Sequence, residues 1–516
     1  MLQLGLVRTR WVVLSIVLLI VAIAGVLALR LPISSERLRA SVIETLSARL
    51  DSDVELASLT VRAFPRLHAE GGGLTIRRKG QAGYPPLISV KSFTVDGDLV
   101  GLYRKHVARM EVVGLDIQIP PRDRKAHAQE PKKTHSVGSP NGDLIVDNLV
   151  STDARLVIIP REAGKSPKVW NIHRLHMTNV GLAQAMPFQA TLTNAVPPGE
   201  IETAGHFGPW ERDDPGATPL DGTFSFEKAD LSVFKGISGI LSAHGTFGGK
   251  LERIDIHGET STPQFTVAVG GHPVPLDAKY HSIVDGTNGN TILERIDASF
   301  LNTSILAQGG VIDLPGEPGR EVSLDVTIDR GRLEDVLKLA VKADPPMQGA
   351  LTLKTKFVLP PGHEDVVEKL RLNGQFSIAG GRFSSDEVQQ KINELSRRGR
   401  AKQAQARPQQ VASDFSGQFA LANGVLSLPR VSFAVPGAGV QLAGQYDLRA
   451  ETLGFRGNLL MDAKVSQAVG GGIKGMVLRV IDPLFEKNGR TVIPIKISGR
   501  RQQPSFGLDV GRLFKK

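Results

Sequence analysis

The sequence predicts a mostly β chain with peripheral helices, placed after an N-terminal transmembrane helix. Three observations support this fold class. An uninterrupted apolar run begins near the N-terminus, apolar residues then alternate with polar ones along most of the chain, and helical patterns are few. The 55 glycines and 31 prolines favour many turns over long helices.

The apolar run from Trp11 to Leu29 predicts a membrane anchor over residues 11–30. Its only clearly polar side chain is Ser15, and as a helix it would span about 28 Å, close to the ~30 Å hydrocarbon core of a bilayer. The alternative is a cleaved signal peptide, but the apolar region of such a peptide usually has about 7–15 residues. A short tail is easier to leave in the cytoplasm than a large domain. We therefore expect residues 1–10 to be a cytoplasmic tail, with the large domain across the membrane.

Beyond the anchor, the pattern first predicts a helix and then strands. Leu38, Val42, Leu46 and Leu50 recur every four residues after a possible cap at Ser34, which is typical of an amphipathic helix. A strand is expected over 54–61, and the first of many short strands near position 74.

A period of two dominates the rest of the chain. Leu351 and Leu353 alternate with Thr352 and Lys354, as in an antiparallel sheet with one apolar and one solvated face. Eight residues with this alternation are the candidate apolar lining: Val322, Leu324, Val326, Ile328, Leu351, Leu353, Phe357 and Leu359. From spacing alone, a second sheet would explain this face as well as a ligand would.

Composition divides the part beyond the anchor into two β-rich regions, 31–200 and 215–516. The stretch 196–221 is rich in Pro, Gly and acidic residues and is expected to link them, and 120–141 is expected to be a disordered insertion. Helical patterns within the second region are confined to a few segments, namely 332–342, 386–398 and 465–486.

Two repeated patterns suggest stacked strand units. The spacing Ile-x-Gly-x₄-Pro-x-Phe occurs at 256–265 and again at 497–506, and we interpret each copy as a strand, a turn and a second strand. A looser Gly-x-Phe unit, expected at strand starts, begins at Gly222, Gly245, Gly374 and Gly417.

The net charge of +10 lies mainly in two low-complexity segments. Segment 121–136 carries +3 and segment 396–410 carries +5, so the remainder is nearly neutral. This distribution argues against a basic nucleic-acid-binding face. The two segments are interpreted either as solvated loops or as contacts with anionic lipid head groups. The chain has no cysteine, so it uses no disulfides.

The motifs of common enzymes are missing or lack their structural context. Gly470-x-Gly472-x-x-Gly475 matches a dinucleotide fingerprint without a βαβ unit around it. His173 and His176 have no third ligand nearby in sequence, and the twelve histidines show no metal-ligand spacing. We therefore predict a protein that is not an enzyme and has no metal site and no cofactor.

Three stretches near the C-terminus resemble the AsmA family. They are EVQQKINELSRRGR (387–400), DFSGQFALANGVLSLPRVSFAVPGAGVQLAGQYDLRAETLGFRGNLLMDAKVSQ (414–467) and DPLFEKNGRTVIPIKISGRRQQPSFGLD (482–509). At the N-terminus, the anchor, the helix and Leu-x-x-x-Val-Glu-Leu at 50–56, followed by Phe64-Pro65, fit the same family. The resemblance covers roughly the first seventy and the last hundred and thirty residues.

The resemblance implies a bacterial inner-membrane protein with one span and a large periplasmic part. Such proteins are similar to bridge-like lipid transporters, whose strands form an elongated, curved groove with an apolar lining. We therefore expect this chain to bind or conduct phospholipid through a β-groove, in support of outer-membrane biogenesis and lipid homeostasis in the cell envelope. The alternative is an envelope assembly factor, a scaffold for outer-membrane protein biogenesis that acts through protein contacts.

Overall fold

Strands form most of the structure, and the helices are few and short. The computed structural model describes residues 35–50, 52–62, 66–78, 86–119, 145–158, 168–181, 184–209, 211, 215–286, 288–314, 319–400, 411–464, 486–487, 490–501 and 503–509. The expected tail, anchor and insertion lie outside these residues, and so does the expected helix 465–486 except for Glu486.

No helix within the described residues is both long and apolar enough to cross a bilayer.

The chain forms two units, each described by itself. Unit 1 contains residues 1–230, 241–259 and 281–291, and unit 2 contains 231–240, 260–280 and 292–516. Four strands have residues in both units: β12 (Ile240–Lys250), β13 (Arg253–Val267), β14 (Val274–Val284) and β15 (Thr291–Phe300).

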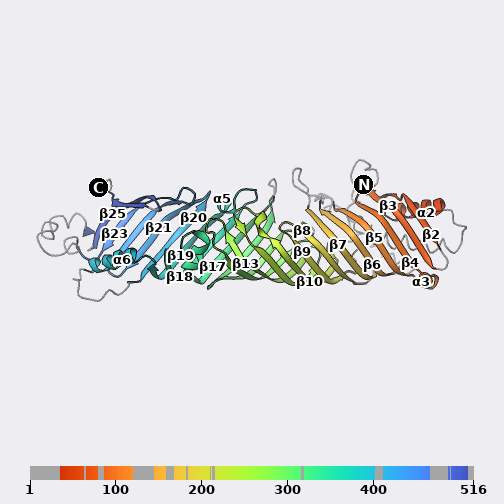
Figure 1. Cartoon of the computed structure of the whole chain (residues 1–516), viewed down its shortest axis with the longest axis horizontal. Helices are drawn as coiled ribbons and strands as arrows, with labels where there is room; N and C mark the ends of the chain where they lie inside the picture. The colour runs from red at the N-terminus through yellow and green to blue at the C-terminus, as the bar shows by residue number, and fades with distance from the viewer. Residues whose placement is uncertain are drawn as a thin grey trace, which may run out of the picture. The chain divides into compact units, whose positions relative to one another are not determined.

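Unit 1 is a sheet whose strands lie side by side, mostly in sequence order (Figure 1). Its other strands are β1 (Ser52–Glu55), β2 (Ser58–Arg62), β3 (Leu67–Arg78), β4 (Ile88–Gly97), β5 (His106–Ile119), β6 (Ile145–Ile158), β7 (Lys168–Val180), β8 (Met186–Ala195), β9 (Pro198–Phe207) and β10 (Pro219–Asp230). Both β1 and β2 pair with β3, and each later strand pairs with the next as far as β10. The described pairings of unit 1 are antiparallel except that between β5 and β6.

The parallel pairing of β5 with β6 requires a long connection between these two strands. His106, where β5 starts, lies opposite Ile145, where β6 starts, and Ile119 at the end of β5 lies opposite Ile158. The chain must therefore return along the length of the strand, and parallel strands need about a dozen or more connecting residues. Residues 120–144 supply that length.

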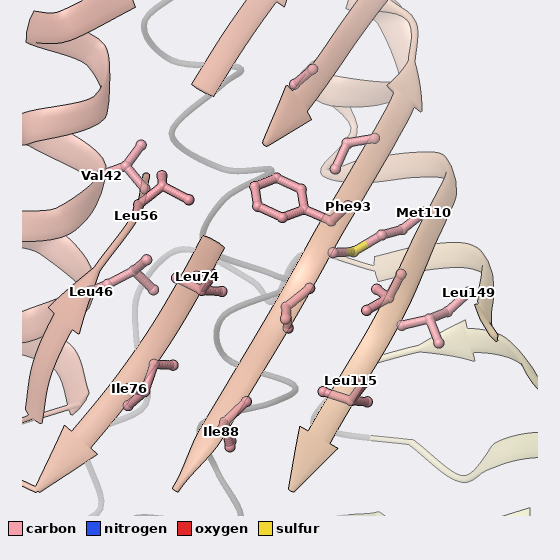
Figure 2. Close-up of a cluster of buried hydrophobic side chains, with 14 of the residues drawn as sticks. Val42, Leu46, Leu56, Leu74, Ile76, Ile88, Phe93, Met110, Leu115 and Leu149 are labelled. Atoms are coloured by element: carbon pink, nitrogen blue, oxygen red, sulfur yellow. The ribbon is translucent and has the colours of Figure 1, made fainter. Parts of the chain in front are cut away.

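Helix α2 (Ser35–Leu50) packs against β1 and β2, at the start of unit 1. Val42 and Leu46 are at most 1% exposed and face Leu56 in the buried cluster of Figure 2. Phe93 of β4 belongs to the same cluster and lies over Gly71, where an added Cβ would sit 2.2 Å from its ring. The predicted amphipathic helix is thus confirmed, and it completes a closely packed core. The short helix α3 (Leu99–Tyr103) joins β4 to β5.

Three expectations for unit 1 are wrong in detail. The strand expected over 54–61 is two strands, because the chain breaks pairing at Leu56 and Ala57 opposite Gly73, whose φ of +64° bends β3. The strand expected from near position 74 begins earlier, at Leu67. The stretch 196–221, expected to be a linker, contains all of β9, because Ile201 and Thr203 alternate with glutamates and pair with β8 and β10.

Unit 2 is an antiparallel sheet with helices along one part of it. Its other strands are β11 (Ile237–Ser238), β16 (Thr303–Asp313), β17 (Arg320–Arg332), β18 (Met347–Leu359), β19 (Arg371–Phe383), β20 (Ser413–Ala422), β21 (Val425–Val435), β22 (Ala438–Asp447), β23 (Thr452–Met461), β24 (Glu486–Lys487), β25 (Arg490–Arg500) and β26 (Gln503–Leu508). Each strand from β16 to β23 pairs with the next, β23 pairs with β25, and β25 also pairs with β24 and β26.

The helices of unit 2 are α4 (Leu333–Ala340), α5 (Val366–Lys369) and α6 (Asp386–Gly399). The helices predicted at 332–342 and 386–398 are therefore confirmed. Ser385 caps α6 by accepting a hydrogen bond from the Val388 backbone N–H at 3.4 Å, and acidic residues in the first turn and basic ones in the last suit the helix dipole.

The two copies of the longer repeat adopt different structures. Residues 256–265 lie within the single strand β13, whereas 497–506 form the end of β25, a turn and β26, with Gly499 opposite Pro504. Strand-turn-strand is thus confirmed for the second copy and wrong for the first. Proline at position 263 does not end β13, because proline tolerates extended backbone.

Candidate functional site

One face of the unit 2 sheet carries apolar side chains over eight consecutive paired strands, β17 to β23 and β25. The strand register arranges them in three rows that cross the strands. The first row is Leu324, Phe357, Leu372, Leu421, Leu426, Tyr446 and Leu453. The second row is Ile328, Leu353, Phe376, Gly417, Val431, Leu442, Gly457 and Ile495. The third row is Leu351, Ile378, Phe415, Phe433, Val440, Leu459 and Ile493.

The third row is covered by helices. Leu333 and Val336 of α4 pack against Leu351 and Ile378, which are buried. Ile392 and Leu395 of α6 pack in the same way against a cluster around Phe433. These contacts account for the apolar faces of α4 and α6 and make this part of the face an ordinary protein core.

The first and second rows are more accessible. Leu324, Leu353, Phe357, Leu372 and Phe376 all keep partial solvent exposure. In unit 1, by comparison, apolar strand residues lie in a buried cluster that includes side chains from α2 (Figure 2). An apolar surface of this kind gains free energy from any apolar cover, at about 25 cal/mol per Å² removed from water.

The opposite face of the same strands is polar and solvent-exposed. On β18, Thr352, Lys354 and Lys356 are exposed, and on β19 Gln375 and Ser377 are exposed. Each of these two strands therefore has one face that is mainly polar and one apolar face, and the apolar face is the one that needs a cover.

The structure places all eight predicted lining residues on this apolar face. Three cross-strand pairs join β17 and β18, namely Val322 with Leu359, Leu324 with Phe357 and Ile328 with Leu353. Val326 lies opposite Thr355, and Leu351 opposite Gly331, beyond a bulge. Ile328 and Leu351 are 3% and 4% exposed, so Leu351 is buried in the covered third row and Ile328 is a buried member of the second row. The other six keep partial exposure.

Sequence reasoning missed the part of the face formed by β19 to β25. The Gly-x-Phe unit was the available signal, but it marks positions within strands and not the strand starts that we expected. Gly374 and Phe376 share a face of β19, and their partners on β20 are Phe419 and Gly417 in reciprocal order. An added Cβ on Gly417 would lie 3.1 Å from the Phe376 ring. Gly417 thus makes room for the phenylalanine of the neighbouring strand.

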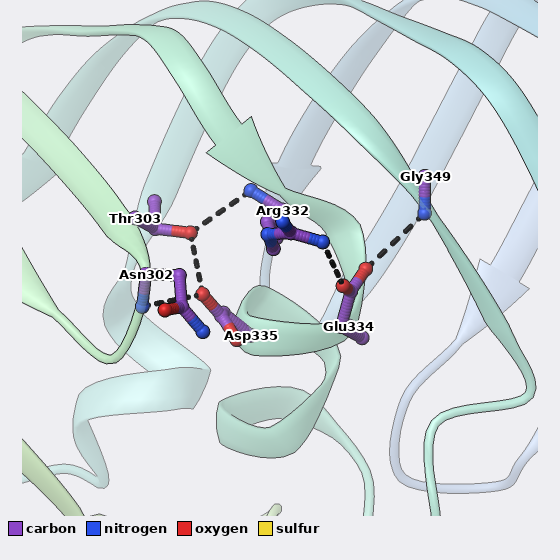
Figure 3. A network of polar contacts seen from close by, with 6 residues as sticks. All are labelled: Asn302, Thr303, Arg332, Glu334, Asp335 and Gly349. Carbon is purple, nitrogen blue, oxygen red and sulfur yellow. Dashed lines mark hydrogen bonds and ion pairs between the residues drawn. The ribbon is translucent and has the colours of Figure 1, made fainter.

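A buried carboxylate anchors α4 beside these rows (Figure 3). Asp335 is 2% exposed and accepts hydrogen bonds from the Asn302 backbone N–H and the Thr303 hydroxyl, both at 2.9 Å. The Thr303 hydroxyl oxygen accepts from the Arg332 backbone N–H at 2.9 Å. The start of β16 and the junction of β17 with α4 are thereby held together through the side chains of Asp335 and Thr303.

Electrostatic effects on the apolar face are small. Among the described residues of the three rows, Tyr446 is the titratable one, and burial raises the pKa of its phenol. The phenol therefore stays neutral and can lie on an apolar surface, with its hydroxyl as a polar end.

A separate group of polar side chains lies in unit 1. Asp255 and His257 on β13 meet His281 on β14. The Asp-x-His spacing was visible in the sequence, because residues two apart share a strand face. The third member could not be found without the fold, because it lies on another strand.

Comparison with family models, with curated proteins and with solved structures finds no match to this chain.

Proposed function

We propose that this protein binds or conducts phospholipid along the apolar face of unit 2, as a membrane-anchored periplasmic protein of the bacterial inner membrane. The observation that supports it most is the pair of partly exposed apolar rows on strands whose opposite face, on β18 and β19, carries exposed polar side chains. The acyl chains of membrane lipids are apolar and abundant, and they could cover these two rows.

The first row has a length suited to an acyl chain. It crosses seven strands, β17 to β23. At about 4.8 Å between strands the row spans roughly 29 Å. One leaflet contributes about half of the ~30 Å hydrocarbon core of a bilayer, so a single acyl chain would fit along the row with room to spare. In this proposal the rows form the lining of an elongated, curved β-groove.

The sequence supports the location. The apolar run Trp11–Leu29 is long enough to anchor the chain in a membrane, and the resemblance to the AsmA family places such an anchor in the inner membrane with the large part in the periplasm. The proposed role is the maintenance of outer-membrane lipid. The chain itself would act without catalysis or a cofactor, so any direction of lipid movement would come from envelope partners.

Site-specific photo-crosslinking tests the proposal. A photoreactive side chain at Leu353 faces the apolar rows, and one at Lys354 faces solvent on the same strand. We expect full-length protein in cells to give lipid adducts from position 353 and none from 354, detected by mass spectrometry. Equal labelling at the two positions would contradict the proposal. A protein adduct without lipid at 353 would favour the envelope assembly factor.

Matched substitutions provide a second readout. Leu353→Lys or Phe357→Glu places a charge on the apolar face, and Thr352→Lys places one on the polar face. We expect the first two to abolish co-purifying phospholipid above the amount held by the anchor, and Thr352→Lys to leave it unchanged, with all three proteins folded by circular dichroism. Unchanged lipid in folded Leu353→Lys would rule out binding at this face.

A further inference from the structure

Two imidazoles and one carboxylate converge on the surface of unit 1. His281 Nε2 lies 2.8 Å from Asp255 Oδ1, and His257 Nε2 lies 3.2 Å from the same oxygen. The two imidazole rings stack with centroids 4.2 Å apart and an angle of 11° between planes. The three candidate donor atoms all lie within 4.8 Å of one another.

These separations are somewhat shorter than the donor spacing around a tetrahedral metal. Zinc binds imidazole nitrogen and carboxylate oxygen at about 2.0–2.2 Å, which puts neighbouring ligand atoms roughly 3.3–3.5 Å apart. The distances from Asp255 Oδ1 to the Nε2 atoms of His257 and His281 are already within about 0.7 Å of that spacing. Because the two stacked rings are nearly parallel, His257 and His281 would have to rotate toward each other for both Nε2 atoms to face one ion.

The chemistry of the donors narrows the choice of ion. Two imidazoles favour zinc, copper, nickel or iron, whereas magnesium and calcium prefer oxygen ligands throughout. The His257 side chain is 66% exposed and that of Asp255 is 44% exposed, so solvent can reach the site and water can complete the coordination. This is the ligand pattern of a site with an open position and not that of a closed structural zinc.

We propose that Asp255, His257 and His281 form a surface binding site for a divalent transition metal, with Zn²⁺ as the ion that fits the donors. Asp255 and His257 come from one strand and His281 from another. A bound ion would therefore join β13 to β14 by a bridge of side chains. This proposal does not depend on lipid binding.

The test is equilibrium dialysis of chelator-treated, full-length protein against Zn²⁺, with the bound metal measured by mass spectrometry. The site variant is His257→Gln with His281→Gln. The control is His173→Gln with His176→Gln, which removes two histidines from β7 of the same unit. We expect the wild type and the control to bind one more equivalent of Zn²⁺ than the site variant, and a tenfold excess of Mg²⁺ not to compete.

Asp255→Asn guards against a folding defect in the double variant, because it keeps the shape of the side chain and removes its charge. We expect its affinity for Zn²⁺ to fall at least tenfold while its melting temperature in chelator stays that of the wild type. Equal stoichiometry and affinity in the wild type, Asp255→Asn and the site variant would overturn the proposal.

Discussion

Glycine and phenylalanine two residues apart have a shared role in these sheets. Gly222 lies beneath Phe247, and Gly245 beneath Phe224, as Gly417 lies beneath Phe376 in unit 2. The arrangement of β10 and β12 is reciprocal, because each strand supplies one phenylalanine ring and one glycine that makes room for the ring of the other strand. A glycine inside a strand loses more conformational entropy on folding than other residues do. The phenylalanine ring of the neighbouring strand, which packs over the glycine, offsets this free-energy cost.

This packing predicts that glycine positions differ sharply in their tolerance of alanine. A Cβ at Gly374 would lie 2.2 Å from the Lys354 carbonyl oxygen, whereas Gly454 has open space. We expect Gly374→Ala to lower the free energy of unfolding by about 1–3 kcal/mol, and Gly454→Ala to change it by less than about 0.5 kcal/mol. Urea denaturation would check both, and equal effects would show that the close approach is not what matters.

His68 is a residue whose protonation stabilises unit 1. Its ring nitrogens lie 2.7 Å from Glu70 and 2.6 Å from Asp96, and these hydrogen bonds, Glu70 first, raise the pKa of His68 above its ordinary 6.5. A raised pKa in the folded state means that the folded protein binds the proton more tightly than the unfolded chain. The stabilisation is complete below the ordinary value and is lost as the pH rises through the folded value.

We expect His68→Gln to destabilise the protein at acidic pH and to have little effect at alkaline pH. Unfolding midpoints measured on both sides of the ordinary histidine pKa would show the gap to the wild type closing as the pH rises. His173→Gln is the control, because the His173 ring contacts the Thr193 hydroxyl at 2.6 Å and not a carboxylate. A gap of constant size for His68→Gln would contradict the ionic role.

At the scale of the element, α4 depends on one carboxylate for its attachment. Asp335→Ala would remove the acceptor of the Asn302 N–H and of the buried Thr303 hydroxyl. Hydrogen bonds to a charged group contribute about 1.5–3 kcal/mol, so we expect a loss of stability of that order or more. Asp329→Ala, on the exposed side of β17, is the control. A similar small loss in both, measured by denaturation, would refute the anchoring role.

The helices and the strand faces were predictable from the sequence because both depend on local periodicity. Leu38, Val42 and Leu46 mark α2, and the alternation in β18 shows which side chains share a face. The shared face of the eight candidate residues on β17 and β18 was predictable for the same reason.

The pairing of strands was not predictable, because register depends on partners far away in sequence. The opposition of Leu324 to Phe357, the approach of His281 to Asp255 and the parallel pairing of β5 with β6 all belong to this class. Strand β9 was missed for another reason. Its glycines and glutamates resemble a linker in composition, and their pairing with β8 and β10 outweighs that tendency.

At the scale of the whole molecule, the path of the chain sets a minimum length for residues 120–144. The end of β5 and the start of β6 are separated by about thirteen residues of paired strand, roughly 43 Å at 3.3 Å per residue. An extended chain covers at most about 3.6 Å per residue, so roughly a dozen residues are needed to make the connection.

Two deletions test this requirement. Removal of 126–132 leaves enough chain, and we expect the melting temperature to change little because the cost of loop closure varies slowly with length. Removal of 121–141 leaves too few residues to reach, and we expect unit 1 to lose the β5–β6 pairing and its cooperative unfolding. A native melting curve for the longer deletion would show that the two strands do not pair in parallel.

The repetition of similar side chains along the first row bears on how a bound molecule would travel. From Leu324 to Leu453, six of the seven steps present a leucine or a phenylalanine, and Tyr446 is the exception. If lipid binds as proposed, an acyl chain that advanced by one strand would exchange one apolar contact for a nearly equal one, so its free energy would vary little along the row. Such a surface would hold an acyl chain against release into water and would still let it slide from strand to strand. The Tyr446 hydroxyl is the polar group in the row, and a sliding molecule would pause there.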